Sequence, residues 1–461
     1  MKVRTVLSCF LAVAVVCRLP ASAAPFKDGD RVVFCGDSVT HHGFYVTPIQ
    51  TFYYTRFPGR NIQIFNCGVG GECASETPWR FEKDVVAKRP TAIHLLLGMN
   101  DVNVLGYFTN AAPDVVARSK SAPATFEKAM GALKRMMDEK LPKTEIVWAT
   151  LVPWDDELRF KTPRPPITGV TAAEEPLCET VRKLHSRHGG GFVDYYTAML
   201  AYNRKLHRRN PYASLSPDRI HPREPGGLFM MRTFLKAHGE PGVVSETVVD
   251  ARKGVLISAE NSEVSGLRAS GDSVSFSLLE KALPFPVEPA AREIADEIGF
   301  DDEFNREVLC IRNLPAGAWK LKIDGAEVCR APADEWAKGV NLAKYATPMM
   351  EQSRKVAALA AGRRDREKVL RSMWCSHMVA RRWLFGLGLE QRDFEDVRYM
   401  LAYARGYVRG DAGRKQGDSG NFRAFLENWP KRTRLEAAVE AAHADIRRAN
   451  RPVAHKFELT R

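Results

Sequence analysis

The first stretch of this sequence that could do chemistry is FCGDSVTHHG, residues 34–43. A β-prone run over residues 31–35 stops at Gly36, and a carboxylate and a hydroxyl follow it, Asp37 and Ser38. A serine hydroxyl is a weak nucleophile unless a neighbouring base takes its proton. Ser38 is therefore a candidate nucleophile that needs a histidine and a carboxylate from elsewhere in the chain.

A suitable base and carboxylate stand together far downstream, in Asp218-Arg219-Ile220-His221. Imidazole titrates near neutrality, so His221 can accept the proton of Ser38. A carboxylate must hold the ring in the right tautomer. Asp218 is three residues upstream, which is the same side of a tight turn or first helical turn. These residues predict a Ser-His-Asp arrangement for acyl transfer.

Two further segments follow predicted strands and could stabilise the oxyanion of the reaction, NCGVGG at 66–71 and GMND at 98–101. The expected donors are the backbone N–H of Ser38, a glycine N–H within 68–71 and the side-chain amide of Asn100. Loss of one such donor typically costs about 100- to 1000-fold in rate. The segments therefore supply an oxyanion hole to the predicted nucleophile.

Other polar residues near these segments are expected to support the site. Asp37 should brace the Ser38 turn through backbone hydrogen bonds, and Asp101 should cap the turn that follows it. His41 and His42 could line the pocket or bind a metal. Adjacent residues point in different directions on a helix or strand, however, so a packing role is favoured for this pair.

Aromatic residues near the predicted loops, Trp79, Trp154 and Tyr45, could stack on sugar rings. Aromatic side chains beside loops are commonly just packed, and we treat packing as the alternative.

The four segments, in this order and at strand ends, resemble the SGNH (GDSL) hydrolase superfamily over residues 30–240. The resemblance implies Ser38 as the nucleophile, Asp218 and His221 as its triad partners, and Gly71 and Asn100 as oxyanion donors. The choice of Gly71 over the neighbouring glycines rests on its distance from Asn66. It also implies a flavodoxin-like doubly wound α/β fold, with no cofactor and no metal.

The elements that must position these residues follow a regular pattern between residues 29 and 240. Short β-prone runs alternate with helical stretches such as 124–140, and they occur at 32–35, 62–65, 93–97, 146–149 and 192–194. Such alternation predicts a parallel sheet covered on both faces, with the site outside the carboxyl ends of the strands. Gly36 would end the first strand at that edge, and the loop around 155–176 should lie on the surface near the site.

Beyond residue 240 the pattern changes twice. Short strands without long helices predict a small antiparallel β-domain at 241–347, and Asp324-Gly325 is a hairpin signal. From Pro348 the period becomes helical, which predicts a C-terminal helical region at 348–461. Its helices are expected at 348–384, 393–408, 420–428 and 432–449. The first domain would then span 24–240. The whole arrangement resembles long exported bacterial SGNH proteins.

The chain has a formal charge of +13, and its basic excess is concentrated near the C-terminus. Residues 351–461 hold 24 Lys and Arg against 14 Asp and Glu, whereas residues 24–350 hold 41 of each sign. A basic surface can attract an acidic glycan, an anionic lipid or nucleic acid. The favoured alternative is a solvated, arginine-rich helical face. No Walker loop, zinc spacing or RNA-binding motif is present, so no nucleic-acid partner is expected.

The first residues have the features of a secretory signal. Lys2 and Arg4 precede a twelve-residue apolar run and an Ala21-Ser22-Ala23 cleavage site, so residues 1–23 are expected to be removed on export to the periplasm or outside the cell. Twelve apolar residues are too few to span a bilayer, which needs about twenty. No transmembrane segment is expected elsewhere. The seven remaining cysteines are odd in number and scattered, which does not indicate a disulfide framework.

Together these observations predict an exported serine esterase that acts on O-acetyl esters of carbohydrates, from an acylated small molecule to a polysaccharide. Export, an accessory β-domain and the lack of a long apolar lid segment favour that substrate class. Two alternatives stay open. A lipase, thioesterase or acyltransferase would use the same residues, and a non-catalytic glycan-binding protein would use only the pocket and the basic region.

Overall fold

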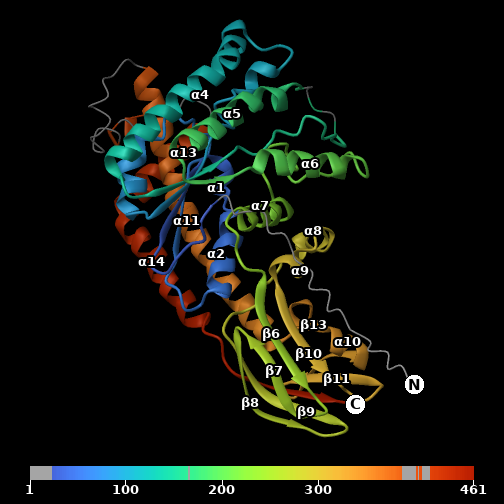
Figure 1. Ribbon diagram of the computed structural model, residues 1–461. Helices are drawn as coiled ribbons and strands as arrows, with labels where there is room; N and C mark the ends of the chain where they lie inside the picture. The colour runs from blue at the N-terminus through green and yellow to red at the C-terminus, as the bar shows by residue number, and fades with distance from the viewer. Residues whose placement is uncertain (1–22, 163, 165–166, 387–400, 403, 407–415) are drawn as a thin grey trace.

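The computed structural model describes residues 23–162, 164, 167–386, 401–402, 404–406 and 416–461. They form an α/β domain, a β-domain and a helical region that runs beside both (Figure 1). Of the expected signal peptide, 1–23, only Ala23 lies inside the described residues, and most of the helix expected at 393–408 also lies outside them. Across the described ranges, no helix is long and apolar enough to cross a membrane.

The α/β domain is built on a five-stranded parallel sheet in the order β2-β1-β3-β4-β5. This is the doubly wound order with a switch point between β1 and β3. The strands are β1 (Arg31–Gly36), β2 (Gln63–Gly68), β3 (Ala92–Leu96), β4 (Glu145–Ala149) and β5 (Gly191–Val193). The predicted fold class is confirmed, and each predicted strand is present.

Helices connect these strands. They are α1 (Ser38–His42), α2 (Val46–Arg56), α3 (Pro78–Arg80), α4 (Pro113–Lys140), α5 (Val170–His188), α6 (Tyr195–His207) and α7 (Glu224–Ala237). Helix α4 is longer than the expected 124–140, because it begins at Pro113 and continues through Pro123. Proline is typical of a first helical turn and is disfavoured in a helix interior, so a helix that runs through Pro123 is not expected from the sequence.

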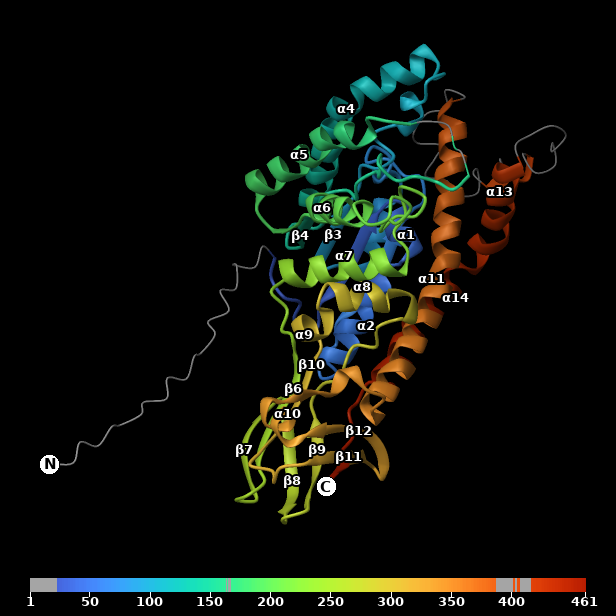
Figure 2. The ribbon, with the colours of Figure 1, turned by 90° about the vertical axis from the view of Figure 1, so that its right-hand side faces the viewer.

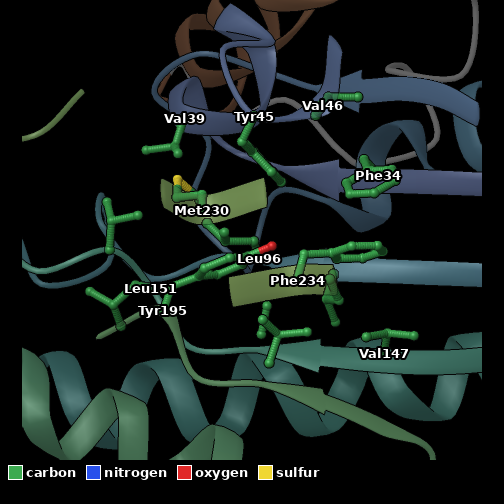
Figure 3. Packing of buried hydrophobic residues seen from close by; sticks show 14 of the residues in the cluster. Phe34, Val39, Tyr45, Val46, Leu96, Val147, Leu151, Tyr195, Met230 and Phe234 are labelled. Carbon is green, nitrogen blue, oxygen red and sulfur yellow. The ribbon is translucent and has the colours of Figure 1, made fainter. Parts of the chain in front are cut away.

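The core of the α/β domain packs aromatic side chains of α7 against the first strand. Figure 3 shows Phe34 of β1 beside Tyr45 and Phe234. Its ring centroid lies 5.7 Å from that of Tyr45 and 5.8 Å from that of Phe234. All three rings are buried. This packing holds β1, whose end carries the predicted nucleophile, rigidly against its neighbours.

The β-domain contains two sheets, in the orders β13-β10-β6-β7 and β12-β11-β14-β9-β8. Its elements are β6 (Val243–Asp250), β7 (Val255–Glu260), β8 (Ser262–Ala269), β9 (Ser273–Glu280), α8 (Arg292–Glu297), α9 (Phe300–Phe304), β10 (Arg306–Arg312), β11 (Ala318–Ile323), β12 (Ala326–Pro332), α10 (Ala333–Lys338), β13 (Val340–Asn341) and β14 (His455–Thr460).

Two features of the β-domain differ from the sequence expectation. Strands β6 and β10 pair in parallel, so the domain is not wholly antiparallel. Strand β14 was expected to belong to the helical region 348–461, but it lies between β9 and β11 in the second sheet. Its alternating Phe457 and Leu459 are buried against that sheet, a pattern too short to stand out at the end of a helical region.

The helical region contains α11 (Pro348–Gly386), α13 (Gln416–Asn428) and α14 (Arg432–Ala449). Figure 2 shows α11 running from the β-domain along the side of the α/β domain. Its buried Trp374 and Met378 pack in one cluster with Phe425 of α13 and with Val69, in the loop after β2. The helical region is therefore joined to the loop that was predicted to supply oxyanion donors.

Candidate active site

The predicted site segments begin at one edge of the sheet. Gly36 at the end of β1 is in register with Gly68 of β2 and Leu96 of β3. A Cβ at Gly36 would come within 2.4 Å of the carbonyl oxygen of Leu96 and still closer to Thr40 Oγ1. Only glycine therefore lets β1 end this close to β3, with Ser38 starting α1 immediately beyond it.

Ser38, His221 and Asp218 form one hydrogen-bonded chain. The Ser38 hydroxyl lies 2.8 Å from His221 Nε2, and His221 Nδ1 lies 2.8 Å from Asp218 Oδ2. Because the carboxylate accepts from Nδ1–H, Nε2 is free to accept the serine proton. The structure therefore brings together the three residues predicted as the triad.

The Asp218 carboxylate is held in place by its own loop. Its second oxygen accepts the backbone N–H groups of Ile220, at 3.0 Å, and His221, at 2.7 Å. Partial burial would raise the pKa of Asp218, but the hydrogen bonds from the side chain and backbone of His221 outweigh it and lower that pKa. Asp218 is thus a carboxylate at neutral pH, as orienting the imidazole requires.

The loop after β2 makes a tight turn over Val69–Glu72. The N–H of Glu72 donates to the carbonyl of Val69, at 3.2 Å, and Gly71 has φ of +80°. A positive φ at the third position is typical of a type II turn and requires glycine. The peptide group between Gly70 and Gly71 is therefore turned over, which sets the direction of the Gly71 N–H.

The other glycines of this loop have their N–H groups occupied. The Gly68 N–H donates to Asn66 Oδ1, at 2.9 Å, and the Gly70 N–H approaches His41 Nδ1, at 3.2 Å. Among the described residues, the Gly71 N–H has no hydrogen-bond acceptor. This difference favours Gly71 as the oxyanion donor of the loop.

Asn100 and Asp101 hold the same loop from the β3 side. Asn100 Nδ2 donates to the carbonyl of Glu72, at 3.0 Å, which leaves its second amide hydrogen for a substrate. Asp101 was expected to cap the turn that follows it, but its carboxylate accepts the N–H of Ala74, far upstream. Burial raises the pKa of Asp101 to about 7.

Asp37 braces the nucleophile as the sequence predicts. It is fully buried, and its Oδ1 accepts the N–H of Val39 at 3.0 Å, which caps helix α1. Burial raises the pKa of Asp37 to about 7. Ser38 occupies the first position of the helix that Asp37 caps, so Asp37 fixes the direction from which Ser38 approaches the site.

The two histidines of α1 point in different directions, and both meet the site. His41 Nδ1 faces Gly70, whereas the ring of His42 lies 4.7 Å from that of His221, centroid to centroid. The sequence favours a packing role for both histidines, and no pattern in it indicates these contacts. Among the described residues, no group of three or more His, Cys, Asp or Glu could hold a metal ion.

The aromatic residues considered for sugar stacking are packed inside the protein. Tyr45 and Trp154 are buried, and Tyr45 bonds to Thr40. The Arg219 guanidinium lies 5.7 Å from the ring centroid of Trp154, and the Arg381 guanidinium lies 5.4 Å from that of Trp79. These contacts support the packing alternative.

Arg219 also ties the expected surface loop to the catalytic loop. Its guanidinium donates to the carbonyls of Leu158 and Ile167, and its own carbonyl accepts the N–H of Asp155. Arg219 has φ of +78°, an unfavourable conformation for a residue with a side chain. Asp155, Leu158 and Ile167 of this loop therefore border the segment that carries Asp218 and His221.

The seven cysteines of the described chain are free. Cys35 and Cys67 are buried strand residues. Neither a Cys67–Cys73 nor a Cys310–Cys329 disulfide is formed.

Comparison with known proteins agrees with this geometry. Residues 34–227 match the GDSL-like lipase/acylhydrolase family, a range that includes every residue of the predicted site. Residues 34–227 therefore form an SGNH hydrolase domain of the GDSL type, and the protein is a carboxylic-ester hydrolase.

Two known proteins are similar to different shares of this chain. An acetylxylan esterase of Geobacillus stearothermophilus is 23% identical over 232 residues, which are 46% of this chain and 94% of the relative. The solved structure of a gut microbial diltiazem-metabolizing enzyme is 28% identical, with a TM-score of 0.84 over 96% of this chain and 99% of that chain. The second likeness extends over the β-domain and helical region.

Proposed function

We propose that this GDSL hydrolase is an exported esterase that uses Ser38, His221 and Asp218 to remove O-acetyl groups from carbohydrates. The observation that carries the proposal is the hydrogen bond of 2.8 Å between Ser38 Oγ and His221 Nε2, with Asp218 on the other ring nitrogen. A serine paired in this way is the arrangement that nucleophilic acyl transfer needs.

The reaction proceeds in two displacements. Ser38 Oγ attacks the ester carbonyl while His221 Nε2 takes its proton, and the resulting imidazolium is stabilised by Asp218. His221 then gives the proton to the leaving alcohol, which leaves an acyl-Ser38 ester. Water, losing a proton to His221, attacks that ester, and Ser38 leaves as the acid is released.

Three N–H groups are proposed to bind the oxyanion of each tetrahedral intermediate: the backbone N–H of Ser38, that of Gly71 and the side-chain amide of Asn100. The turn geometry at Gly71 and the hydrogen bond from Asn100 to Glu72 support this set, because both preorganise the donors before the substrate arrives.

The carbohydrate substrate is supported by the acetylxylan esterase relative, which shares nearly its whole length with this chain. The predicted signal peptide supports export to the periplasm or the outside of the cell, where acetylated polysaccharides are found.

Docking of an acidic glycan on the basic C-terminal region has less support. Several arginines of that region are committed to acids of the protein: Arg371 to the buried Asp84, Arg382 to Glu76, and Arg363 to Glu367. The contacts therefore favour the alternative, a basic region whose arginines hold the structure together.

The test is acetate release from a panel of acetylated polysaccharides, with the Ser38→Ala variant as the blank. A long-chain lipid ester, a thioester and diltiazem complete the panel. Acetate release from a glycan that exceeds turnover of the other substrates supports the proposal. Preference for the lipid ester or thioester would overturn the carbohydrate assignment but not the triad, and no turnover by either protein would overturn both.

A further inference from the structure

Helix α11 lies outside the residues that match the family, yet three of its side chains contact the loop after β2. This loop begins at Val69 and carries Gly71, and we call it the oxyanion loop. Gly70 N–H lies 3.1 Å from Cys375 Sγ. Arg382 Nη2 donates to the carbonyl of Gly71, at 2.6 Å. A Cβ at Gly71 would lie 3.8 Å from Met378 Cε. These three contacts surround Gly71, whose N–H has no hydrogen-bond acceptor among the described residues.

The two polar contacts, made by Cys375 and Arg382, hold the peptide groups on either side of the one that carries the Gly71 N–H. The Gly71 N–H belongs to the peptide between residues 70 and 71. Cys375 holds the peptide before it, through the Gly70 N–H, and Arg382 holds the peptide after it, through the Gly71 carbonyl. With both neighbouring peptides held, the Cα atoms of Gly70 and Gly71 cannot shift without straining a hydrogen bond to α11.

We propose that α11 acts as a clamp on the oxyanion hole, with Arg382 and Cys375 as positioning residues for the Gly71 N–H. The proposal rests on the proposed function, since it assigns these residues a part in the same reaction. A shift of the loop backbone at Gly70 or Gly71 would move the Gly71 N–H relative to Ser38. The clamp disfavours that shift, because it would strain the hydrogen bonds to Cys375 and Arg382.

Arg382 also holds the later part of the oxyanion loop, through Glu76. Arg382 pairs with the Glu76 carboxylate, and that carboxylate accepts the N–H of Cys73, at 2.8 Å. One guanidinium thus fixes both the carbonyl of Gly71 and the carboxylate that holds the rest of the loop. A planar guanidinium with several donors can do this, whereas an ammonium group cannot do so in the same geometry.

His41 completes the other side of the clamp. Burial lowers the pKa of His41 to about 3 and raises the pKa of the Cys375 thiol to about 11. Both groups are therefore neutral near pH 7. His41 Nδ1 lies 3.3 Å from Cys375 Sγ, so the thiol can donate to the ring while the Gly70 N–H approaches both atoms.

A second network anchors α11 so that the clamp has a fixed base. Both terminal nitrogens of the buried Arg371 guanidinium bond to the Asp84 carboxylate, at 2.6 and 2.7 Å. Asp84 also accepts from Arg80, which in turn pairs with Glu72 of the oxyanion loop. Although burial would raise the pKa of Asp84, Arg371 and Arg80 hold that pKa below its ordinary value.

The experiment compares Arg382→Ala and Arg382→Lys with the matched control Arg366→Ala, in the full chain and with a short nitrophenyl ester. The guanidinium of Arg366 donates to the carbonyl of Gly362, on its own helix and away from the oxyanion loop. We expect Arg382→Ala to lower kcat about tenfold or more with KM nearly unchanged, because oxyanion donors act mainly in the transition state. The Arg366→Ala control should keep wild-type kcat.

Chemical rescue separates positioning from folding. The Arg382 side chain is 40% exposed, so a free guanidinium ion can reach the space that Arg382→Ala leaves. We expect millimolar guanidinium to restore part of the lost kcat of this variant and to leave the control unaffected. Arg382→Lys should lie between alanine and wild type.

The outcomes are distinct. Unchanged kcat in Arg382→Ala, or a loss that follows the melting temperature and resists rescue, overturns the clamp. A rise in KM alone also overturns it, since that would indicate substrate binding. A wild-type chain that hydrolyses no ester and does not react at Ser38 with a phosphonate overturns the proposed function, and the clamp with it.

Cys375 gives an independent test. Cys375→Ser keeps a hydroxyl donor and acceptor beside Gly70, and Cys375→Ala removes them. We expect the serine variant to retain more kcat than the alanine variant at equal thermal stability. Equal activity of the two would remove Cys375 from the clamp.

Discussion

His42 and His221 lie ring beside ring, with centroids 4.7 Å apart at an interplanar angle of 56°. Burial, and then the neighbouring His221 and Arg223, lower the pKa of His42 to about 4. Two imidazoles therefore share the site, and His42 stays uncharged over the pH range in which esterases are commonly assayed.

The first prediction concerns this pair. His42→Gln should leave the acidic limb of the kcat/KM profile where it is, because His42 does not gain a proton until about pH 4. The profile of the variant and the wild type, measured with one nitrophenyl ester, provides the comparison. A displaced limb would mean that His42 titrates together with the catalytic base.

Ser38→Ala should abolish ester hydrolysis without unfolding the protein. The hydroxyl is a reagent, and its loss leaves only a small gap at the first position of α1. Activity on a nitrophenyl ester and the melting temperature are the measurements. A folded variant with wild-type activity would contradict the mechanism.

Asp218→Asn should lower kcat by about 10³- to 10⁴-fold with little effect on folding, because an amide favours the wrong imidazole tautomer. Asp101→Asn should cost much less, since the Asp101 carboxylate bonds to the N–H of Ala74 rather than to His221. The two variants are compared by kcat and by melting temperature. If Asp101→Asn were the more damaging to kcat, the triad carboxylate would have been misassigned.

Two buried carboxyl groups in the β-domain predict a pH-dependent stability. Burial, and then the charge of Glu280, raise the pKa of Glu307 well above its ordinary value of 4.5, and burial raises that of Glu280. The folded state therefore keeps protons that the unfolded chain gives up above pH 4.5. Stability contributed by the neutral groups is present below that pH and is lost as pH rises through the folded pKa.

Glu307→Gln should thus flatten the decline of melting temperature as pH rises above the ordinary glutamate pKa of 4.5, because its amide cannot lose a proton. Glu260→Gln, on the exposed strand β7, is the control and should follow the wild type. A wild-type curve as flat as that of Glu307→Gln would show that the buried pair does not govern stability.

The basic region predicts a weak response to salt. Because several of its arginines pair with acids of the protein, kcat/KM for an acidic acetylated glycan and for nitrophenyl acetate should fall equally little from about 50 to about 500 mM salt. A steep fall for the glycan alone would instead establish electrostatic docking on residues 351–461.

The sheet and the triad could be predicted because their signals are local. Each parallel strand is a short buried run, and its partners follow from the alternation of strands and helices. Asp218 and His221 are three residues apart, and Ser38 follows a strand that ends in glycine. In each case the reactive side chain and the residues that indicate its position lie within one short segment of the sequence.

The clamp could not be predicted, because its partners are separated by most of the chain. Nothing near Arg382 indicates Glu76 or Gly71 as its partner, and helical periodicity describes only one helix at a time. The basic excess of residues 351–461 was visible, but the acids that neutralise Arg371 and Arg382 lie in the α/β domain. Charge counted by segment cannot reveal pairs that form between segments.

The central place of β14 in its sheet has a consequence for how the protein is made. Its neighbours β9 and β11 precede the whole helical region in the order of synthesis, and they lack a common partner until residues 455–460 have left the ribosome. Until then both strands expose open edges that invite mispairing with other chains. The sheet closes from its middle, and only once residues 455–460 are available, so the facing edges of β9 and β11 stay open until β14 arrives.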